Sequence, residues 1–220
     1  MITAAFRAIG DIASPEFRDV LLKSIGLTIV LFAAIILATI FVLDTLKLVP
    51  WGWAETILDV AASLGIAVLA IFLMAPVTAM FAGFFLDRVA GLVEKRHYPG
   101  DLPGRELPVS AALKTSFEFG LLVLLVNILL LPSFFFGIGA IAMLAGNAYL
   151  LSREYFELAA MRHMEPAEAK ALRKENSPRI FLAGLAPALL ALVPIVNIVV
   201  PLFSTAYFIH LFKQVRASSA

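Results

Sequence analysis

The chain has 220 residues, of which 61% are hydrophobic and only 15% are charged, and its net charge at pH 7 is +1. Soluble domains carry about 25% charged residues, so the composition favours an integral membrane protein over a soluble helical bundle with a very large core. The charge balance and the lack of basic patches with aromatic residues argue against a nucleic-acid partner, and the absence of cysteine excludes disulfides and thiolate metal sites.

The first thirteen residues are predicted to form a short amphipathic helix. Ile2, Phe6 and Ile9 recur at helical spacing, and Arg7 lies off the face that they form. A helix of this kind lies in the membrane interface, where its apolar face contacts lipids. The alternative interpretation is a frayed terminus.

The first membrane span is predicted at Ile25–Leu43, nineteen residues without a charge. At about 1.5 Å per residue this run covers about 28 Å, close to the roughly 30 Å of a bilayer's hydrocarbon core. Ser14 and Pro15 predict a helix start well before it, because serine caps helices and proline suits their first position. The run is too long for a signal peptide, so we interpret it as an uncleaved span.

A second long helix is predicted at Thr56–His97, after a turn at Asp44–Glu55 that contains both tryptophans of the chain. Tryptophan is typical of membrane–water boundaries. Pro76 is expected to kink this helix because it removes a backbone hydrogen bond. Residues 98–109 are rich in proline and glycine and are predicted to be loop.

Four shorter apolar segments then form two predicted helical hairpins, each tipped by proline. The segments are Phe119–Leu131 with Phe134–Leu151, and Ile180–Val193 with Ile195–Leu211, the last with Pro201 inside it. Each segment is short for a complete crossing, so the hairpins enter the bilayer and need not span it fully. The charged stretch Ser152–Arg179 between them is expected outside the membrane, with a short helix from Pro166 to about Lys174.

The distribution of basic residues predicts the orientation. Sixteen of the seventeen lysines and arginines fall on one side of the membrane if each hairpin returns to its starting face. Basic loops stay cytoplasmic, so both termini are expected in the cytoplasm. The predicted fold is an all-α integral membrane protein of one domain, residues 1–216, with two long transmembrane helices, the two hairpins and the N-terminal amphipathic helix.

No catalytic motif appears in the chain, and we expect no enzyme, no cofactor and no metal site. The histidines His97, His163 and His210 are far apart in the sequence and are interpreted as polar residues beside the cytoplasmic segments. Two asparagines, Asn127 and Asn197, each lie in a Val-Asn-Ile triplet before a proline. They are candidate polar residues of a solute pathway, as in broken transporter helices, or hydrogen-bonding contacts between helices.

The turn before the first span is the candidate anion site. A helix N-terminus offers free N–H groups and the positive end of the helix dipole, and Arg18 adds a guanidinium that suits tetrahedral oxyanions. The alternative is an ordinary cap with an arginine that binds lipid phosphate. Glu16 and Asp19 oppose an anion at this turn.

Four features together resemble the CysZ family over about residues 5–215. They are the Ser-Pro-x-x-Arg start of the first long helix, Ala75-Pro76 in the second, the Arg-Glu-Tyr-Phe-Glu run from Arg153, and the segment Pro194–Pro201. The resemblance implies a homo-oligomeric bacterial inner-membrane protein that takes up sulfate for cysteine biosynthesis.

The resemblance also implies a sulfate site at the first helix, where the family has a Gly-hydrophobic-Arg-Arg turn. Phe17 and Arg18 match its hydrophobic and first arginine positions, whereas Glu16 and Asp19 depart from it. The function expected is channel-like transport of sulfate or a related small anion. The alternative is a membrane scaffold or regulatory protein that has the same fold and does not transport.

Overall fold

The computed structural model describes residues 1–46, 86–106, 118, 121–123, 125–126, 128–197 and 199–219. Helices make up the regular structure of these residues, which confirms the all-α prediction. The labelled elements are α1 (Ile2–Ile12), α2 (Pro15–Leu46), η1 (Leu131–Phe136), α5 (Gly139–Met161), α6 (Pro166–Glu175), α7 (Ser177–Leu190), α8 (Pro194–Asn197) and α9 (Val200–Ser219). Residues 86–97 form a further helix. The tryptophan turn beyond Leu46, the predicted kink at Pro76, and Asn127 lie outside the described residues.

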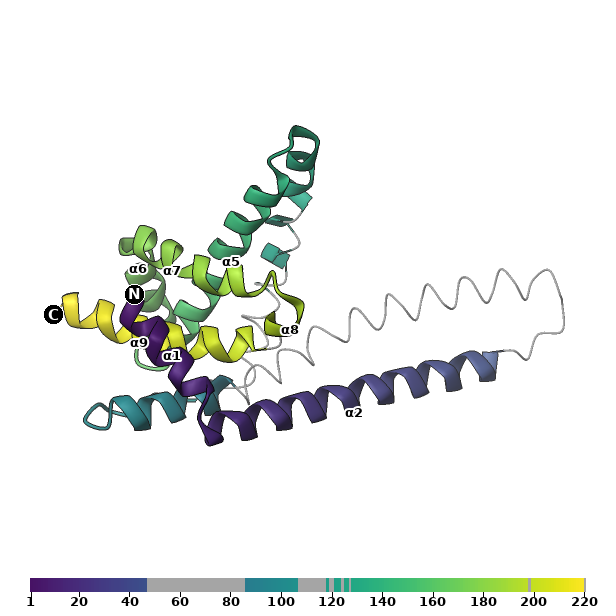
Figure 1. Cartoon of the computed structure of the whole chain (residues 1–220), viewed down its shortest axis with the longest axis horizontal. Helices are drawn as coiled ribbons and strands as arrows, with labels where there is room; N and C mark the ends of the chain where they lie inside the picture. Colours follow the sequence, from purple (N-terminus) through teal and green to yellow (C-terminus); the bar gives the residue numbers. More distant parts are fainter. Residues whose placement is uncertain are drawn as a thin grey trace.

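The helices form one packed group with two projections (Figure 1). In the group, α5 packs against α6, α7 and α9, and α1 packs against α9. The helix α2 extends away on one side, and η1 with the first half of α5 extends on another. The first and last helices of the chain therefore lie side by side.

The helix α2 begins at Pro15 as predicted and covers Ile25–Leu43 without interruption. It continues to Leu46, so the predicted turn at Asp44–Glu55 begins too early; Asp44–Leu46 include no proline or glycine that would end the helix. Among the described residues, no helix combines the length and the apolar character that a membrane crossing needs. The membrane span stays a prediction.

The predicted N-terminal helix is present as α1, and its small side chains face the protein. Ala4 and Ala8 are fully buried, whereas Ile2, Phe6 and Ile9 are 76%, 70% and 56% exposed. Alanine allows a close approach of two helix backbones, so α1 lies tightly against α9 and presents its large apolar side chains outward.

The first hairpin has its tip at η1, which contains Pro132, and Gly137 then takes a left-handed backbone (φ 74°) that starts the return. The returning helix α5 continues beyond the apolar segment, which ends at Leu151, and runs to Met161. Residues 152–161 include the charged residues Arg153, Glu154 and Glu157 but no proline or glycine, and the helix continues through them.

The second hairpin consists of α7 and α9, with the short α8 at its tip. Pro201 is the second residue of α9, which corrects the prediction that it lies inside a helix. A proline in the first turn loses no intrahelical hydrogen bond, because those N–H groups have no acceptor there. The predicted short helix is confirmed as α6, and a capping box between Glu165 and Glu168 fixes its start.

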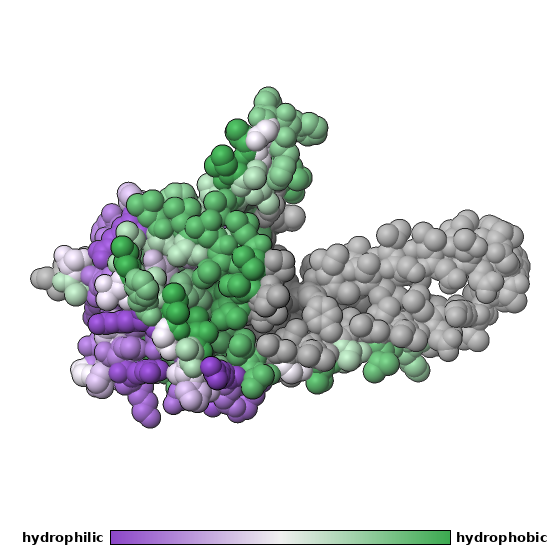
Figure 2. All heavy atoms as spheres, viewed as in Figure 1, coloured by the Kyte–Doolittle hydropathy of each residue, from purple (hydrophilic) through white to green (hydrophobic). Residues whose placement is uncertain are grey.

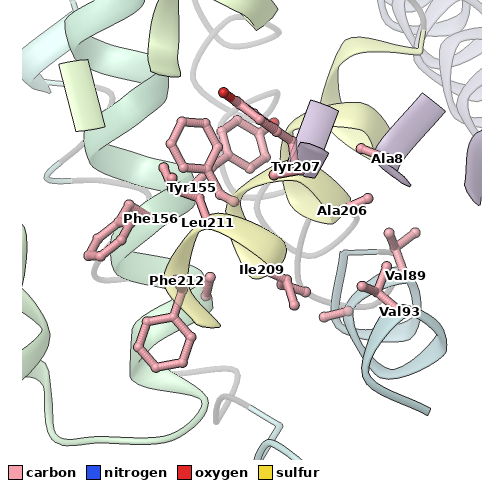
Figure 3. Close-up of a cluster of buried hydrophobic side chains, with 14 of the residues drawn as sticks. Ala8, Val89, Val93, Tyr155, Phe156, Ala206, Tyr207, Ile209, Leu211 and Phe212 are labelled. Atoms are coloured by element: carbon pink, nitrogen blue, oxygen red, sulfur yellow. The ribbon is translucent and has the colours of Figure 1, made fainter. Parts of the chain in front are cut away.

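The core of the described residues is built around α9 (Figure 3). Phe212 of α9 meets Phe156 of α5 edge to face at 6.2 Å between ring centroids. On the other side of α9, the buried residues Val89 and Val93 belong to the helix of residues 86–97. Packing of these neighbouring helices against α9 accounts for the unbroken run of buried residues Leu202–Phe212.

The surface is divided by polarity (Figure 2). Hydrophilic residues gather at the end that carries the C-terminus, and hydrophobic residues cover the rest of the described surface in this view. Large exposed apolar side chains include Phe135, Phe136 and Ile141 on the η1–α5 projection and Leu37 and Phe41 on α2. An apolar surface of this extent marks contact with a membrane or another protein.

Candidate functional site

The candidate anion site is the tight turn between α1 and α2. The Ser14 N–H donates to the Asp11 carbonyl (2.9 Å), and the Arg18 N–H donates to the Ser14 carbonyl (3.1 Å). The first N–H groups of α2 have no acceptor within the helix. The Ser14 hydroxyl oxygen is buried and has no hydrogen-bond partner among the described residues. The turn therefore has donor capacity that its own fold does not use.

Phe17 and Arg18 lie on different faces of α2. Phe17 is 2% exposed and belongs to the hydrophobic core, so it anchors the turn. Arg18 is exposed. Of the two predicted site residues, only Arg18 lies where a solute reaches it.

The negative charge of Asp19 is offset by two neighbouring cations. Asp19 Oδ2 lies 2.7 Å from Lys23 Nζ and 3.9 Å from Arg88 Nη2. With Arg18, three basic side chains surround the turn against the two acidic residues Glu16 and Asp19. Asp19 therefore repels an anion less than the sequence suggests.

Asn197, the predicted pathway residue that the structure describes, is exposed at the end of α8. In the described residues, no hydrogen bond or ion pair joins it to the turn at the start of α2. The structure does not assemble Asn197 with the candidate anion site.

A buried ion cluster lies at the end of α5. The Arg162 guanidinium, 5% exposed, donates to both Glu94 oxygens (3.2 and 3.1 Å), to Asp87 and to the Gly104 carbonyl (3.4 Å). Glu94 also accepts from the Gly104 N–H (3.1 Å) and lies 2.9 Å from His163 Nε2. Burial raises the pKa of Glu94, but the hydrogen bonds from His163 and Arg162, the charge of Arg162 and the Gly104 amide lower that pKa to about 2. These contacts connect the helix of residues 86–97, and the loop that follows it, to the C-terminal end of α5.

A second buried cluster joins two of the three histidines, which sequence reasoning treated separately. Asp11 Oδ1 lies 2.8 Å from His97 Nε2, and Asp11 Oδ2 lies 3.2 Å from His210 Nε2. Tyr98 Oη lies 2.8 Å from His210 Nδ1. These residues are up to 199 positions apart, so no spacing in the sequence could reveal the cluster.

The described residues thus form an all-α protein with a large exposed apolar surface and its ionic residues at one end. The chain belongs to the family described as Sulfate transporter CysZ/Etoposide-induced protein 2.4, whose model matches residues 4–201. The match confirms the family that the sequence resembles. No curated protein matches the chain.

Proposed function

We propose that this chain is a bacterial inner-membrane transport protein that mediates the uptake of sulfate or a related small anion. The match to a sulfate transporter family over residues 4–201 is the observation that carries the proposal. Uptake is channel-like: donor groups replace the hydration shell of the anion, and no covalent chemistry occurs. The sulfate taken up would supply cysteine biosynthesis.

The exposed apolar side chains support the membrane location. Leu37 on α2, and Phe135 and Phe136 at the tip of the first hairpin, are 66%, 92% and 79% exposed. The hydrocarbon core of a bilayer is a suitable environment for such side chains. In this arrangement α2 crosses the membrane, the hairpins insert from the cytoplasmic side, and both termini lie in the cytoplasm. We further expect a homo-oligomer, in which second copies cover part of this apolar surface.

The turn at the start of α2 supports the choice of an anion. Arg18 is exposed beside the free N–H groups of a helix N-terminus, and Lys23 and Arg88 lie around Asp19. Guanidinium and backbone N–H groups are the donors that bind oxyanions in proteins. In the proposed orientation this turn lies on the cytoplasmic side, so the site would bind the anion where it leaves the membrane.

Uptake of radiolabelled sulfate into proteoliposomes tests the proposal. We expect wild-type flux above that of empty vesicles. Arg18→Ala should raise the half-saturating sulfate concentration roughly tenfold, the effect of one charge-assisted hydrogen bond of about 1.5 kcal/mol. Arg216→Ala, which removes an exposed arginine of the last turn of α9, is the matched control and should leave flux unchanged.

A third variant tests the role of local charge. Asp19→Asn removes a negative charge and releases Lys23, so it should lower the half-saturating concentration. Absence of wild-type flux would refute transport and favour the scaffold or regulatory alternative. Normal kinetics in Arg18→Ala would retain transport and discard the site.

A further inference from the structure

We propose that Asp11, His97 and His210 bind a divalent transition-metal ion such as Zn²⁺. The three residues come from α1, from the helix of residues 86–97 and from α9. One ligand atom from each lies within 4.8 Å of the other two. This inference is independent of the proposed transport, and it goes against the expectation from the sequence that no metal binds.

The two contacts of Asp11 with the histidines are close to the ligand separations around a tetrahedral ion, whereas the three ligand atoms as a set lie within 4.8 Å and must draw closer. Zinc bonds of about 2.0–2.1 Å to nitrogen and oxygen place neighbouring ligand atoms about 3.3 Å apart. The two separations from Asp11 oxygens to histidine Nε2 atoms are 2.8 and 3.2 Å. Both imidazoles are thus already directed at one carboxylate, and an ion between them needs shifts of a few tenths of an ångström at those two contacts.

An outer partner orients the buried histidine. Tyr98 Oη is 2.8 Å from Nδ1 of His210. Metal-binding histidines commonly donate the N–H of the other ring nitrogen to such a partner, which leaves the inward nitrogen free to coordinate. Tyr98 directly follows the helix that supplies His97, so one local segment provides a ligand and this support.

The burial of the three residues suits a held ion with one open position. Asp11 and His210 are buried, and the His97 side chain is 23% exposed. That opening gives a route from solvent to the cluster. Arg96 lies 3.6 Å from Asp11 Oδ1, but its side chain is 53% exposed and can turn into solvent when a cation binds.

The donor set defines the class of metal. Two imidazoles and one carboxylate suit Zn²⁺, Co²⁺ and Ni²⁺, whereas Mg²⁺ prefers oxygen ligands alone. A bound ion would cross-link three helices that are distant in the sequence, and it would hold α1 against α9.

Metal titration of the full-length chain tests the inference. The protein is purified in detergent with a tag that lacks histidine, and bound metal is removed with a chelator. We expect one equivalent of Co²⁺ to give the visible absorption of a tetrahedral site, and Zn²⁺ to displace it. Zn²⁺ should also raise the midpoint of thermal unfolding, and Mg²⁺ should do neither.

Four variants locate the ion. Asp11→Asn and His97→Gln change one ligand each with similar size, and each should weaken Co²⁺ binding at least tenfold. His163→Gln, which changes the histidine beside Glu94, is the control and should keep one equivalent. Tyr98→Phe keeps all three ligands and should weaken binding by roughly tenfold, as outer-shell changes do.

Two results would overturn the inference: no tetrahedral Co²⁺ spectrum in the wild-type protein, or an unchanged spectrum and affinity in His97→Gln. Circular dichroism and size exclusion establish that each variant is folded. Because His97 is partly exposed, its replacement leaves the core intact and gives a decisive result even where Asp11→Asn does not fold.

Discussion

Replacement of Glu94 by glutamine should destabilise the protein strongly at neutral pH. The side chain keeps its size, but one oxygen becomes an NH₂ group that faces the Arg162 guanidinium or the Gly104 N–H. Arg162 then retains Asp87 as its one carboxylate partner within the described residues. Loss of one member of a buried ion pair costs about 3–5 kcal/mol.

The pKa of Glu94 gives an independent magnitude. This pKa is lowered from its ordinary 4.5 to about 2, and one pKa unit corresponds to about 1.4 kcal/mol. The charged form is therefore favoured by about 3 kcal/mol in the folded state, in line with the value from the ion pair. In a chain of this size, about 3 kcal/mol corresponds to a decrease of roughly 6–12 °C in the unfolding midpoint.

Thermal unfolding followed by circular dichroism in detergent measures the effect across pH. A carboxylate with a lowered pKa in the folded state stabilises above its unfolded pKa, and the stabilisation is lost as pH falls through the folded pKa. The difference between wild type and Glu94→Gln should be complete above about pH 4.5 and should shrink towards pH 2. Glu175→Gln, at an exposed position, is the control. Equal midpoints at pH 7, or a difference that is constant with pH, would refute the reasoning.

Two further predictions concern packing and topology. Gly184→Ala should destabilise the protein by about 1–3 kcal/mol, because an added Cβ would overlap the Ala148 carbonyl where α7 crosses α5. Gly91→Ala is the control: a Cβ there meets no described atom within 4 Å, so this variant should stabilise the protein by about 0.5–1 kcal/mol. Equal unfolding midpoints of the two variants would contradict this packing. In this cysteine-free chain, Glu16→Cys and Ser218→Cys should each react with an impermeant maleimide from the cytoplasmic face alone, and labelling from the other face would overturn the proposed orientation.

Local sequence signals predicted the parts of the fold that depend on neighbouring residues. Ser14 and Pro15 predicted the start of α2, and Pro166 predicted the start of α6, because caps and prolines act within one helical turn. The prediction that Pro201 lies inside a helix was wrong, because a proline between apolar residues can equally interrupt a helix or begin one.

Features that depend on tertiary contacts were not predictable in the same way. The apolar periodicity of α1 identifies Ile2 and Phe6 as the face that contacts lipids. It does not reveal that Ala4 and Ala8 make the contact with the rest of the protein. The helix needs small residues where another backbone approaches, and hydrophobic periodicity does not detect them. The candidate site is similar: the position of Arg18 followed from sequence, whereas the pairing of Asp19 with Arg88 required the fold.

The packing of the first helix on the last has a consequence for folding. Three helices that are distant in the sequence, α1, α5 and the helix of residues 86–97, all bury side chains against α9. The Met1 ammonium group donates to the Gln214 side chain (3.2 Å), a contact between residues 213 positions apart. During synthesis, α1 therefore leaves the ribosome well before α9, and the contacts between the two helices form only after α9 has followed. Contacts between residues so distant in the sequence slow folding, and the core contacts around α9 form only after this helix has been synthesised.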